Sequence, residues 1–207
     1  PGYRLERVTD AASGRALCVL AQRAEDATPR LGWGTFVVTE GPARPVHLLA
    51  PHPKHDAGTA TQATAIFSHT AAKSVLVAGA SRYAAPAGTG CGERPASDPT
   101  HSAATVFQPT VAAIAAVAPE DLFVQLHGMG DRSCPTLDVY LTHGSAEAPP
   151  AHGLLRRLRA ALAARRPGWT VALPGDDGPG CHLNGTRNVQ GRSEEHTSEL
   201  QSRMFIS

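Results

Sequence analysis

Two histidines of this chain follow short apolar runs, and residues of this type at such positions can bind a metal ion. His52 comes just after Val46–Ala50, with Asp56 four residues further on, and His127 directly follows Leu122–Leu126. Parallel strands of one sheet end at the same edge, where the sites of open α/β sheets form. Two imidazoles and a carboxylate match a catalytic zinc site that keeps one position open for water. This arrangement predicts Zn²⁺ as cofactor, with His52, Asp56 and His127 as ligands.

The pairing of the two histidines carries this prediction, not either histidine alone. The chain has ten histidines, and most histidines in proteins are structural or solvent-exposed. Two of them just past the ends of separate buried strands are more informative, because burying a polar ring costs free energy unless it has a partner. His55 lies beside Asp56 and is an alternative second ligand.

The composition is that of one globular domain with a sizeable core. The chain has 207 residues, of which 42% are hydrophobic and 18% charged, and its formal net charge is +1. The mixed charges give no broad basic field, so we expect no nucleic-acid partner. No uninterrupted apolar run is long enough to cross a bilayer, so we expect no membrane partner. Abundant alanine and an almost complete preference for arginine over lysine suggest a GC-rich bacterial genome.

The four cysteines are widely separated, at positions 18, 91, 134 and 181. None forms a C-x-x-C pair, which argues against a zinc ribbon or a thioredoxin-like redox motif. One or two disulfides and buried free thiols both remain open. The chain begins at Pro1 without a signal-peptide pattern, and an exported or a cytoplasmic location is equally compatible with it.

Strands and helices alternate along the predicted domain. Runs of strand type are expected at Ala16–Ala21, Thr35–Thr39, Val46–Ala50, Ser74–Ala78, Leu122–Leu126, Leu137–Leu141 and Trp169–Leu173. Helices are expected at Thr59–Ala72, His101–Val117 and Ala151–Arg166, the second kinked or split at Pro109. This order predicts an α/β fold, a three-layer sandwich around a mostly parallel or mixed sheet. The first two strands have no helix between them and are expected to pair antiparallel at an edge.

Several segments resemble motifs of two related groups, the poly-gamma-glutamate hydrolases and the N-formylglutamate amidohydrolases. PHPKHDAGT resembles the loop of the first ligands, SVLVAGASRYA the following strand, and VQLHG the second histidine motif. TLDVYLTHG, LLRRLRAALAARR and LNGTRNVQGR follow in a similar order, so the likeness covers Pro45 to Arg192. It implies a zinc-carboxypeptidase-like (phosphorylase/hydrolase-like) fold. It also implies the zinc ligands named above, and hydrolysis of an amide next to a carboxylate in a glutamate-like or poly-gamma-glutamate-like substrate.

The sequence departs from the family pattern in two ways. The acid at position 56 is aspartate, one methylene shorter than glutamate. The general base of the family is a glutamate on a later strand, which would lie beyond Gly191, so no catalytic base is assigned here. A binding protein on the same fold, which holds a metal or ligand without turnover, is therefore the alternative function.

Three residues are predicted to bind the acidic small-molecule or peptide-like substrate. Arg82 follows a strand end on the same sheet and could clamp a carboxylate through its fork of donors, or could be an ordinary surface arginine. The resemblance implies that Arg187 and Asn188 also reach the substrate.

Two other groups have simpler interpretations. Asp98, within SDPTH, first suggests a helix N-cap; orienting a metal-bound histidine is the sharper alternative, as it is for His101. The segment GASRY around Ser81 lacks the final glycine of a nucleophile elbow, so a serine hydrolase is not expected.

Residues 192–207 do not have the pattern of a folded segment. The stretch RSEEHTSELQS, residues 192–202, matches the in-frame translation of a sequencing adapter over eleven residues, and RMFIS follows without a core pattern. A genuine polar tail would explain the charges alone. We expect one hydrolase-like domain over residues 1–191, incomplete at its C-terminal end, and a non-native tail over 192–207.

Overall fold

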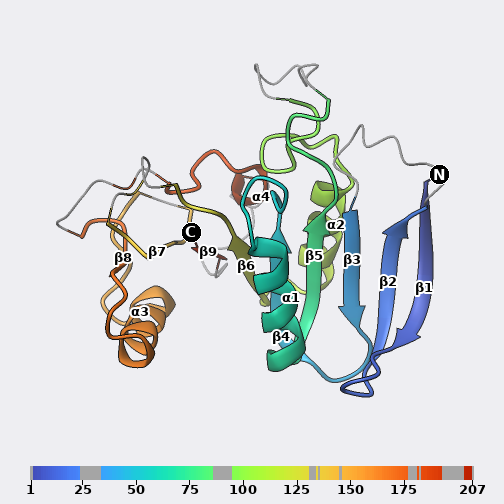
Figure 1. Ribbon diagram of the computed structural model, residues 1–207, viewed down its shortest axis with the longest axis horizontal. Coiled ribbons are helices and arrows are strands. Elements are labelled where there is room, and N and C mark those ends of the chain that lie inside the picture. The colour runs from blue at the N-terminus through green and yellow to red at the C-terminus, as the bar shows by residue number, and fades with distance from the viewer. Residues whose placement is uncertain are drawn as a thin grey trace.

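The computed structural model describes residues 2–23, 34–85, 95–130, 134, 136–144, 146–176, 181, 183–192 and 203–206. Within these ranges, nine strands form a sheet in the order β1-β2-β3-β5-β4-β6-β9-β7-β8 (Figure 1). The strands are β1 Tyr3–Thr9, β2 Ala16–Gln22, β3 Gly34–Thr39, β4 Arg44–Ala50, β5 Ala72–Ala78, β6 Leu122–Leu126, β7 Val139–Thr142, β8 Val171–Ala172 and β9 Arg203–Ile206. The helices are α1 Thr59–Thr70, α2 Phe107–Val117, α3 Leu154–Arg165 and α4 Val189–Arg192.

The sheet is mixed, as an α/β fold with crossover helices allows. Strands β5, β4 and β6 are parallel at its centre, connected through α1 and α2. The first strands of the chain pair antiparallel through β1, β2 and β3. The α/β class, the mixed sheet and the antiparallel pairing of Ala16–Gln22 with Gly34–Thr39 confirm the predictions. Strand β1 was not predicted from the sequence, and it forms the outermost strand at this end.

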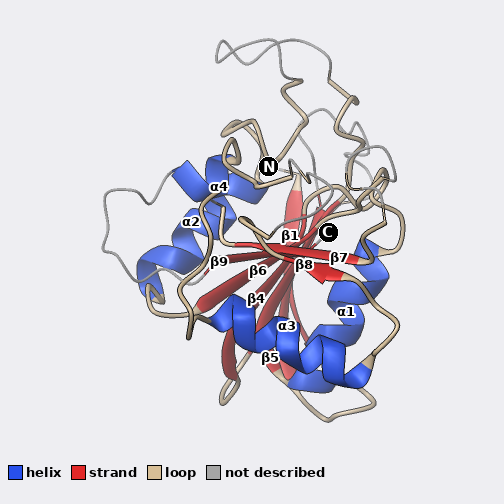
Figure 2. Cartoon of the chain, turned by 90° about the vertical axis from the view of Figure 1, so that its left-hand side faces the viewer, coloured by secondary structure: helices blue, strands red, loops and turns tan. Residues whose placement is uncertain are grey.

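Helices pack against both faces of the sheet. Neighbouring residues of a central strand point to opposite faces, so each contributes to a different core. Leu48 belongs to a core with Phe67 of α1 and Leu155 of α3. Leu49, the next residue, belongs to a second core with Val111 of α2. Figure 2 shows α1 and α3 on one side of the strands and α2 on the other.

The second helix begins later than the sequence suggested. We predicted a helix from His101, kinked or split at Pro109, but α2 begins at Phe107. Pro109 therefore lies in the first helical turn, where its missing N–H would have no partner in the helix, so no kink follows. Residues 95–106 form turns instead, and those turns contribute to the site described below.

The final described strand lies in a segment for which we expected no core element. Strand β9 pairs parallel with β6 and antiparallel with β7. Backbone pairing does not report where a sequence comes from, so the adapter-like origin of the tail stays a prediction. Residues 193–202 lie outside the described ranges, as does Cys91. None of the helices in the described ranges is long and apolar enough to cross a membrane.

Candidate metal centre

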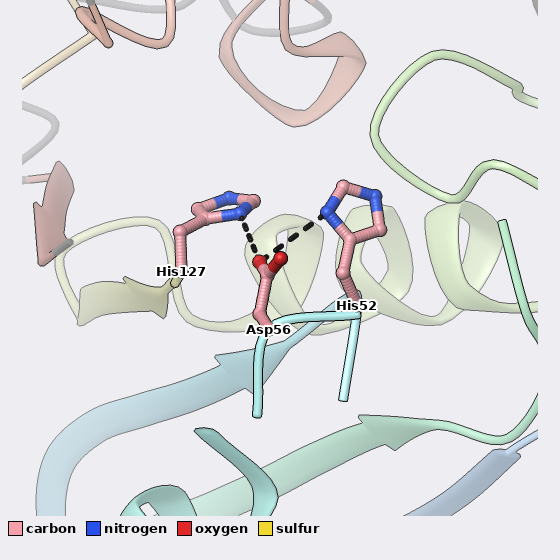
Figure 3. A group of neighbouring side chains, drawn as sticks. All are labelled: His52, Asp56 and His127. Atoms are coloured by element: carbon pink, nitrogen blue, oxygen red, sulfur yellow. Dashed lines mark hydrogen bonds and ion pairs between the residues drawn. The ribbon is translucent and has the colours of Figure 1, made fainter. Parts of the chain in front are cut away.

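The loop after β4 brings His52 and Asp56 to the same side of one turn. The carbonyl of His52 accepts hydrogen bonds from the backbone N–H groups of His55 and Asp56, at 2.9 and 2.8 Å. The Asp56 carbonyl in turn accepts from the hydroxyl of Thr59, the first residue of α1, at 2.8 Å. This turn connects the strand directly to the helix and places the Asp56 carboxylate near the His52 ring (Figure 3).

His127 reaches the same place from the neighbouring strand. Strands β4 and β6 are parallel, with Leu49 opposite Gln125, so their carboxyl ends lie side by side. His127 Nδ1 lies 3.1 Å from Asp56 Oδ2, and His52 Nδ1 lies 3.6 Å from the same oxygen. One ligand atom from each of the three residues can be chosen so that all lie within 4.8 Å of one another. The predicted metal-binding group is thus assembled in space (Figure 3).

The Nδ1 atom of His52 is the strongest sign that this group suits a cation. It is buried and has no hydrogen-bond partner among the described residues. Its other ring nitrogen, Nε2, lies 2.9 Å from Oδ1 of Asp98. A carboxylate can only accept a hydrogen bond, so in the neutral ring Nε2 carries the proton and Nδ1 presents its lone pair toward Asp56. A buried lone pair beside a carboxylate and a second imidazole fits the donors that zinc prefers.

Both carboxylates near His52 are charged at neutral pH. Burial alone would raise the pKa of Asp56, but the hydrogen bond from His127, the nearby His52 ring and the Gly128 backbone N–H lower it well below its usual range. Burial would also raise the pKa of Asp98. Its hydrogen bonds from His101, His52 and Arg82 more than offset burial, so the pKa of Asp98 is also lowered.

The two imidazoles differ in their proton affinity. Burial would lower the pKa of His52, but the neighbouring Asp56 and Asp98 carboxylates outweigh burial and raise it. The pKa of His127 is lowered, chiefly because burial disfavours its charged form. Metal binding requires both rings in their neutral state, so a cation would compete with a proton mainly at His52.

Gly128 allows the close approach of the two loops. A Cβ atom at this position would lie 2.9 Å from Asp56 Cα and 3.0 Å from Asp56 Cβ. Any side chain would therefore push the acid loop away from His127. The need for glycine here was not recognised from the sequence, although the H-G pair after β6 was visible in it.

Asp98 orients His52, which corrects our preference for a helix cap at this position. Asp98 is 1% exposed. Its Oδ1 accepts from His52 Nε2 and from the backbone and hydroxyl of Thr100, and its Oδ2 from Arg82 and His101. Helix α2 begins nine positions later, so Asp98 does not cap it. The geometry supports the other interpretation, a carboxylate that orients His52 within the candidate group.

Arg82 and His55 take positions beside the group. Arg82 donates from Nε and Nη2 to Asp98 Oδ2, at 3.2 and 2.7 Å. His55 is exposed and its Nε2 lies 2.8 Å from the Ser81 hydroxyl, while its ring meets Tyr83 edge to face. The group that could hold a metal ion contains Asp56, and His55 is directed to a different partner.

The other two predicted substrate residues lie on the segment that leads into α4. Arg187 is exposed. Asn188 is buried; its amide donates to Gln125 Oε1, and its Oδ1 accepts from the backbone N–H of Gln190 at 3.1 Å. These bonds connect α4 to β6 and give Asn188 a packing role. A substrate role for either residue stays a prediction.

A second histidine cluster, not anticipated from the sequence, lies at the opposite ends of the central strands. His47 in β4 joins Ser74 in β5 through Nδ1 at 2.7 Å and Asp121 before β6 through Nε2 at 3.0 Å. Its ring stacks on Phe123, with centroids 4.7 Å apart. The order Ser–His–Asp resembles a hydrolytic triad, but Ser74 is fully buried and no substrate can reach it. This cluster holds three strands together.

Comparison with known proteins gives little further information. No family model matches the sequence, and no curated protein matches it significantly. A solved structure described as "Putative carboxypeptidase A" from Shewanella denitrificans OS-217 is similar at 14% identity and a TM-score of 0.40. The match covers 99% of this chain and 55% of the other, so this chain spans about half of that protein's length. Similarity at this level assigns neither a family nor an activity.

Proposed function

We propose that this chain is a zinc-dependent hydrolase of the carboxypeptidase-like, three-layer kind. The proposal rests above all on the buried Nδ1 atom of His52, which has no hydrogen-bond partner among the described residues and faces Asp56 and His127. Zinc bound by these three residues would lower the pKa of a water molecule and polarise a carbonyl group. The same three residues stand at the carboxyl ends of two parallel strands, where α/β enzymes place their sites.

In this proposal the protein prepares the ligands before any cation arrives. Asp98 keeps the proton of His52 on Nε2, so Nδ1 is available as a donor. Arg82 and His101 hold Asp98 in place by bonding its second oxygen. Asp56 provides the negative charge that partly balances the cation. No general base is assigned to a described residue.

The proposed substrate is an amide beside a carboxylate, in a glutamate-like or poly-gamma-glutamate-like molecule. The sequence motifs quoted above suggest this class. Arg82 uses its Nε–Nη2 edge on Asp98, so a substrate carboxylate would have to meet the other edge, formed by Nη1 and Nη2. Arg187 is exposed and free to approach an acidic substrate as the motif implies.

The metal site is tested first by elemental mass spectrometry on purified, dialysed protein. We expect about one zinc per chain in the wild type and a loss of most of it in His127→Ala and Asp56→Asn. His55→Ala is the matched control, because it removes a neighbouring histidine of the same loop that bonds Ser81 and not the group. Zinc lost in His55→Ala but kept in Asp56→Asn would overturn the ligand assignment, as would a folded wild type without metal.

Activity is tested separately on gamma-glutamyl amides and short poly-gamma-glutamate chains. Release of free carboxylate by the zinc-loaded wild type, and none by His127→Ala, would support the hydrolase. Bound zinc without turnover of any such substrate would instead favour the alternative, a binding protein that holds a metal or ligand on the same fold.

A further inference from the structure

Three buried side-chain amides connect β6 to the turn that carries Asp98. Gln125 on β6 and the residues Asn188 and Gln190 are each at most 5% exposed. Asn188 Nδ2 donates to Gln125 Oε1, and Gln125 Nε2 donates to Gln190 Oε1 at 3.4 Å. Gln190 Nε2 in turn donates to the carbonyl of Pro99, the residue after Asp98, at 2.6 Å. We call Gln125, Asn188 and Gln190 the amide network.

The two ends of the amide network fix the orientation of every amide in it. The Pro99 carbonyl can only accept, so Gln190 presents Nε2 to it and Oε1 to Gln125. Gln125 must then donate through Nε2 and accept through Oε1. At the other end, Asn188 Oδ1 accepts from the Gln190 backbone N–H at 3.1 Å, which can only donate. Turning any one amide over would set two donors or two acceptors against each other, so the network allows one arrangement.

A backbone bond beside the amide network holds the same turn. The N–H of Val189 donates to the Thr100 carbonyl at 2.9 Å, so helix α4 bonds two successive carbonyls of the turn. A helix of four residues has too few hydrogen bonds of its own to be stable, and these contacts support it. The N–H and hydroxyl of Thr100 bond Asp98 Oδ1, the oxygen that faces His52 Nε2. The α4 segment therefore holds the backbone on which Asp98 is placed.

The amide network also joins the two sides of the candidate metal centre. Gln125 precedes His127 by two residues and belongs to the strand that ends at it. The turn at the other end of the network carries the carboxylate that orients His52, which comes from β4. A shift of the turn relative to β6 would move Asp98, and with it the His52 ring, away from the position facing His127.

We propose that Gln190 is a positioning residue of the proposed zinc site, an inference that rests on the proposed function. Gln190 holds the turn of Asp98 at a fixed distance from β6, so that the two imidazoles keep the separation that one cation requires. Ligands must stay within about half an ångström of their productive geometry, and a fully bonded buried network provides such rigidity. Gln190 acts through Asp98 and does not itself reach the metal.

Zinc affinity, measured by competition with a chromogenic chelator, tests this role. Gln190→Met keeps the length of the side chain but removes both of its amide contacts, and should lower the affinity about tenfold. Gln62→Met makes the same change at an exposed position of α1 and should leave the affinity unchanged. Gln190→Asn keeps an amide that is one methylene shorter, and should also weaken binding even if the methionine variant does not fold. Wild-type affinity in either folded Gln190 variant would overturn the proposal.

A double-mutant cycle with Asp98→Asn separates positioning from general destabilisation. If Gln190 acts through Asp98, the double variant Asp98→Asn, Gln190→Met should bind zinc about as weakly as Asp98→Asn alone. A merely structural role would lower the affinity by the same factor in both backgrounds. Additive effects of the two substitutions would therefore refute the proposed role of Gln190.

Nuclear magnetic resonance of the metal-free protein distinguishes failure of this inference from failure of the proposed function. The Nε2 proton of His52 is buried against Asp98, so it should exchange slowly with water and give a separate resonance, assigned by its loss in His52→Gln. Gln190→Met should lose this resonance, and Gln62→Met should keep it. A wild type without zinc that shows this pattern would refute the metal site but support the positioning by Gln190. A zinc-binding wild type whose resonance persists in Gln190→Met would overturn the positioning alone.

Discussion

The Nε2 atom of His52 lies 2.9 Å from Oδ1 of Asp98, although the two residues are 46 positions apart in the chain. This contact fixes both the orientation of the imidazole and the nitrogen that carries its proton. The tautomer of His52, and so the nitrogen left free to face Asp56, is therefore set by a residue outside the candidate metal-binding group. Partners of this kind commonly change metal affinity by one to two orders of magnitude.

Asp98→Asn should weaken zinc binding by about 10- to 100-fold, because a neutral amide orients the His52 ring less firmly and removes a nearby negative charge. Affinity is measured by competition with a chromogenic chelator. Asp138, just before β7, accepts a hydrogen bond from the Thr170 backbone N–H. Asp138→Asn makes the same chemical change away from the group and should leave the affinity unchanged. Equal affinity in wild type and Asp98→Asn would show that Asp98 only packs against His52.

Gly128→Ala should reduce zinc affinity by about tenfold or more, since ligand geometry must hold within roughly half an ångström. The added Cβ would lie 2.9 Å from Asp56 Cα and displace the acid loop. Gly130→Ala is the matched control, because a Cβ at Gly130 meets no atom within 4 Å. Thermal melting of both variants without metal checks that the fold survives. If both alanines have the same effect, the close approach of Gly128 to Asp56 is not what positions the ligand.

The closeness of the two strand-end histidines could be predicted from the sequence because it depends on local order alone. Each histidine follows an apolar run, and parallel strands end at one edge, so the proximity of His52 and His127 follows from topology. The contact of Asp98 with His52 depends on the path of a long connection between β5 and α2. No periodic pattern reports such a path, and a local cap was the simpler interpretation.

The missed first strand has a different physical reason. Strand β1, YRLERVT, carries charges on both of its faces and buries neither, so it lacks the alternation by which a half-buried strand is recognised. Its pairing with β2 comes from backbone hydrogen bonds. The late start of α2 has a third reason: residues before Phe107 bond to the Asp98 carboxylate and to one another, and these bonds compete with the helix.

The stability of the fold should fall as the pH drops below about 6.5, in part because of His47. Burial lowers the pKa of His47, with Asp121 opposing and Lys73 adding to the shift. Below this pH the unfolded chain binds a proton at His47 that the folded chain does not bind. The contribution of His47 is therefore complete above its unfolded pKa and is lost as the pH falls toward its folded pKa. The slope is at most about 1.4 kcal/mol per pH unit for one proton.

Urea unfolding of metal-free protein at about pH 5 and about pH 8 measures this effect. The comparison is with His47→Gln, which keeps a polar group between Ser74 and Asp121 but does not titrate. His52 acts in the opposite sense, because its pKa is raised, but it is common to both proteins and cancels in the difference. The wild type should lose more stability on acidification than the variant. Parallel pH profiles would mean that His47 remains neutral or charged equally in both states.

The disulfide between Cys134 and Cys181 should contribute about 4 kcal/mol to the free energy of unfolding, since it closes a long loop in the unfolded chain. These residues are 47 positions apart and connect the segment after β6 to the segment before α4. The double variant Cys134→Ala, Cys181→Ala should lose this amount in urea unfolding, and a reducing agent should destabilise the wild type by a similar amount. Cys18→Ala is the control, because Cys18 is free and bonds Glu40. A reducing agent that lowers the stability of the double variant as much as that of the wild type would place the redox-sensitive bond elsewhere, since the double variant has no Cys134–Cys181 bond left to reduce.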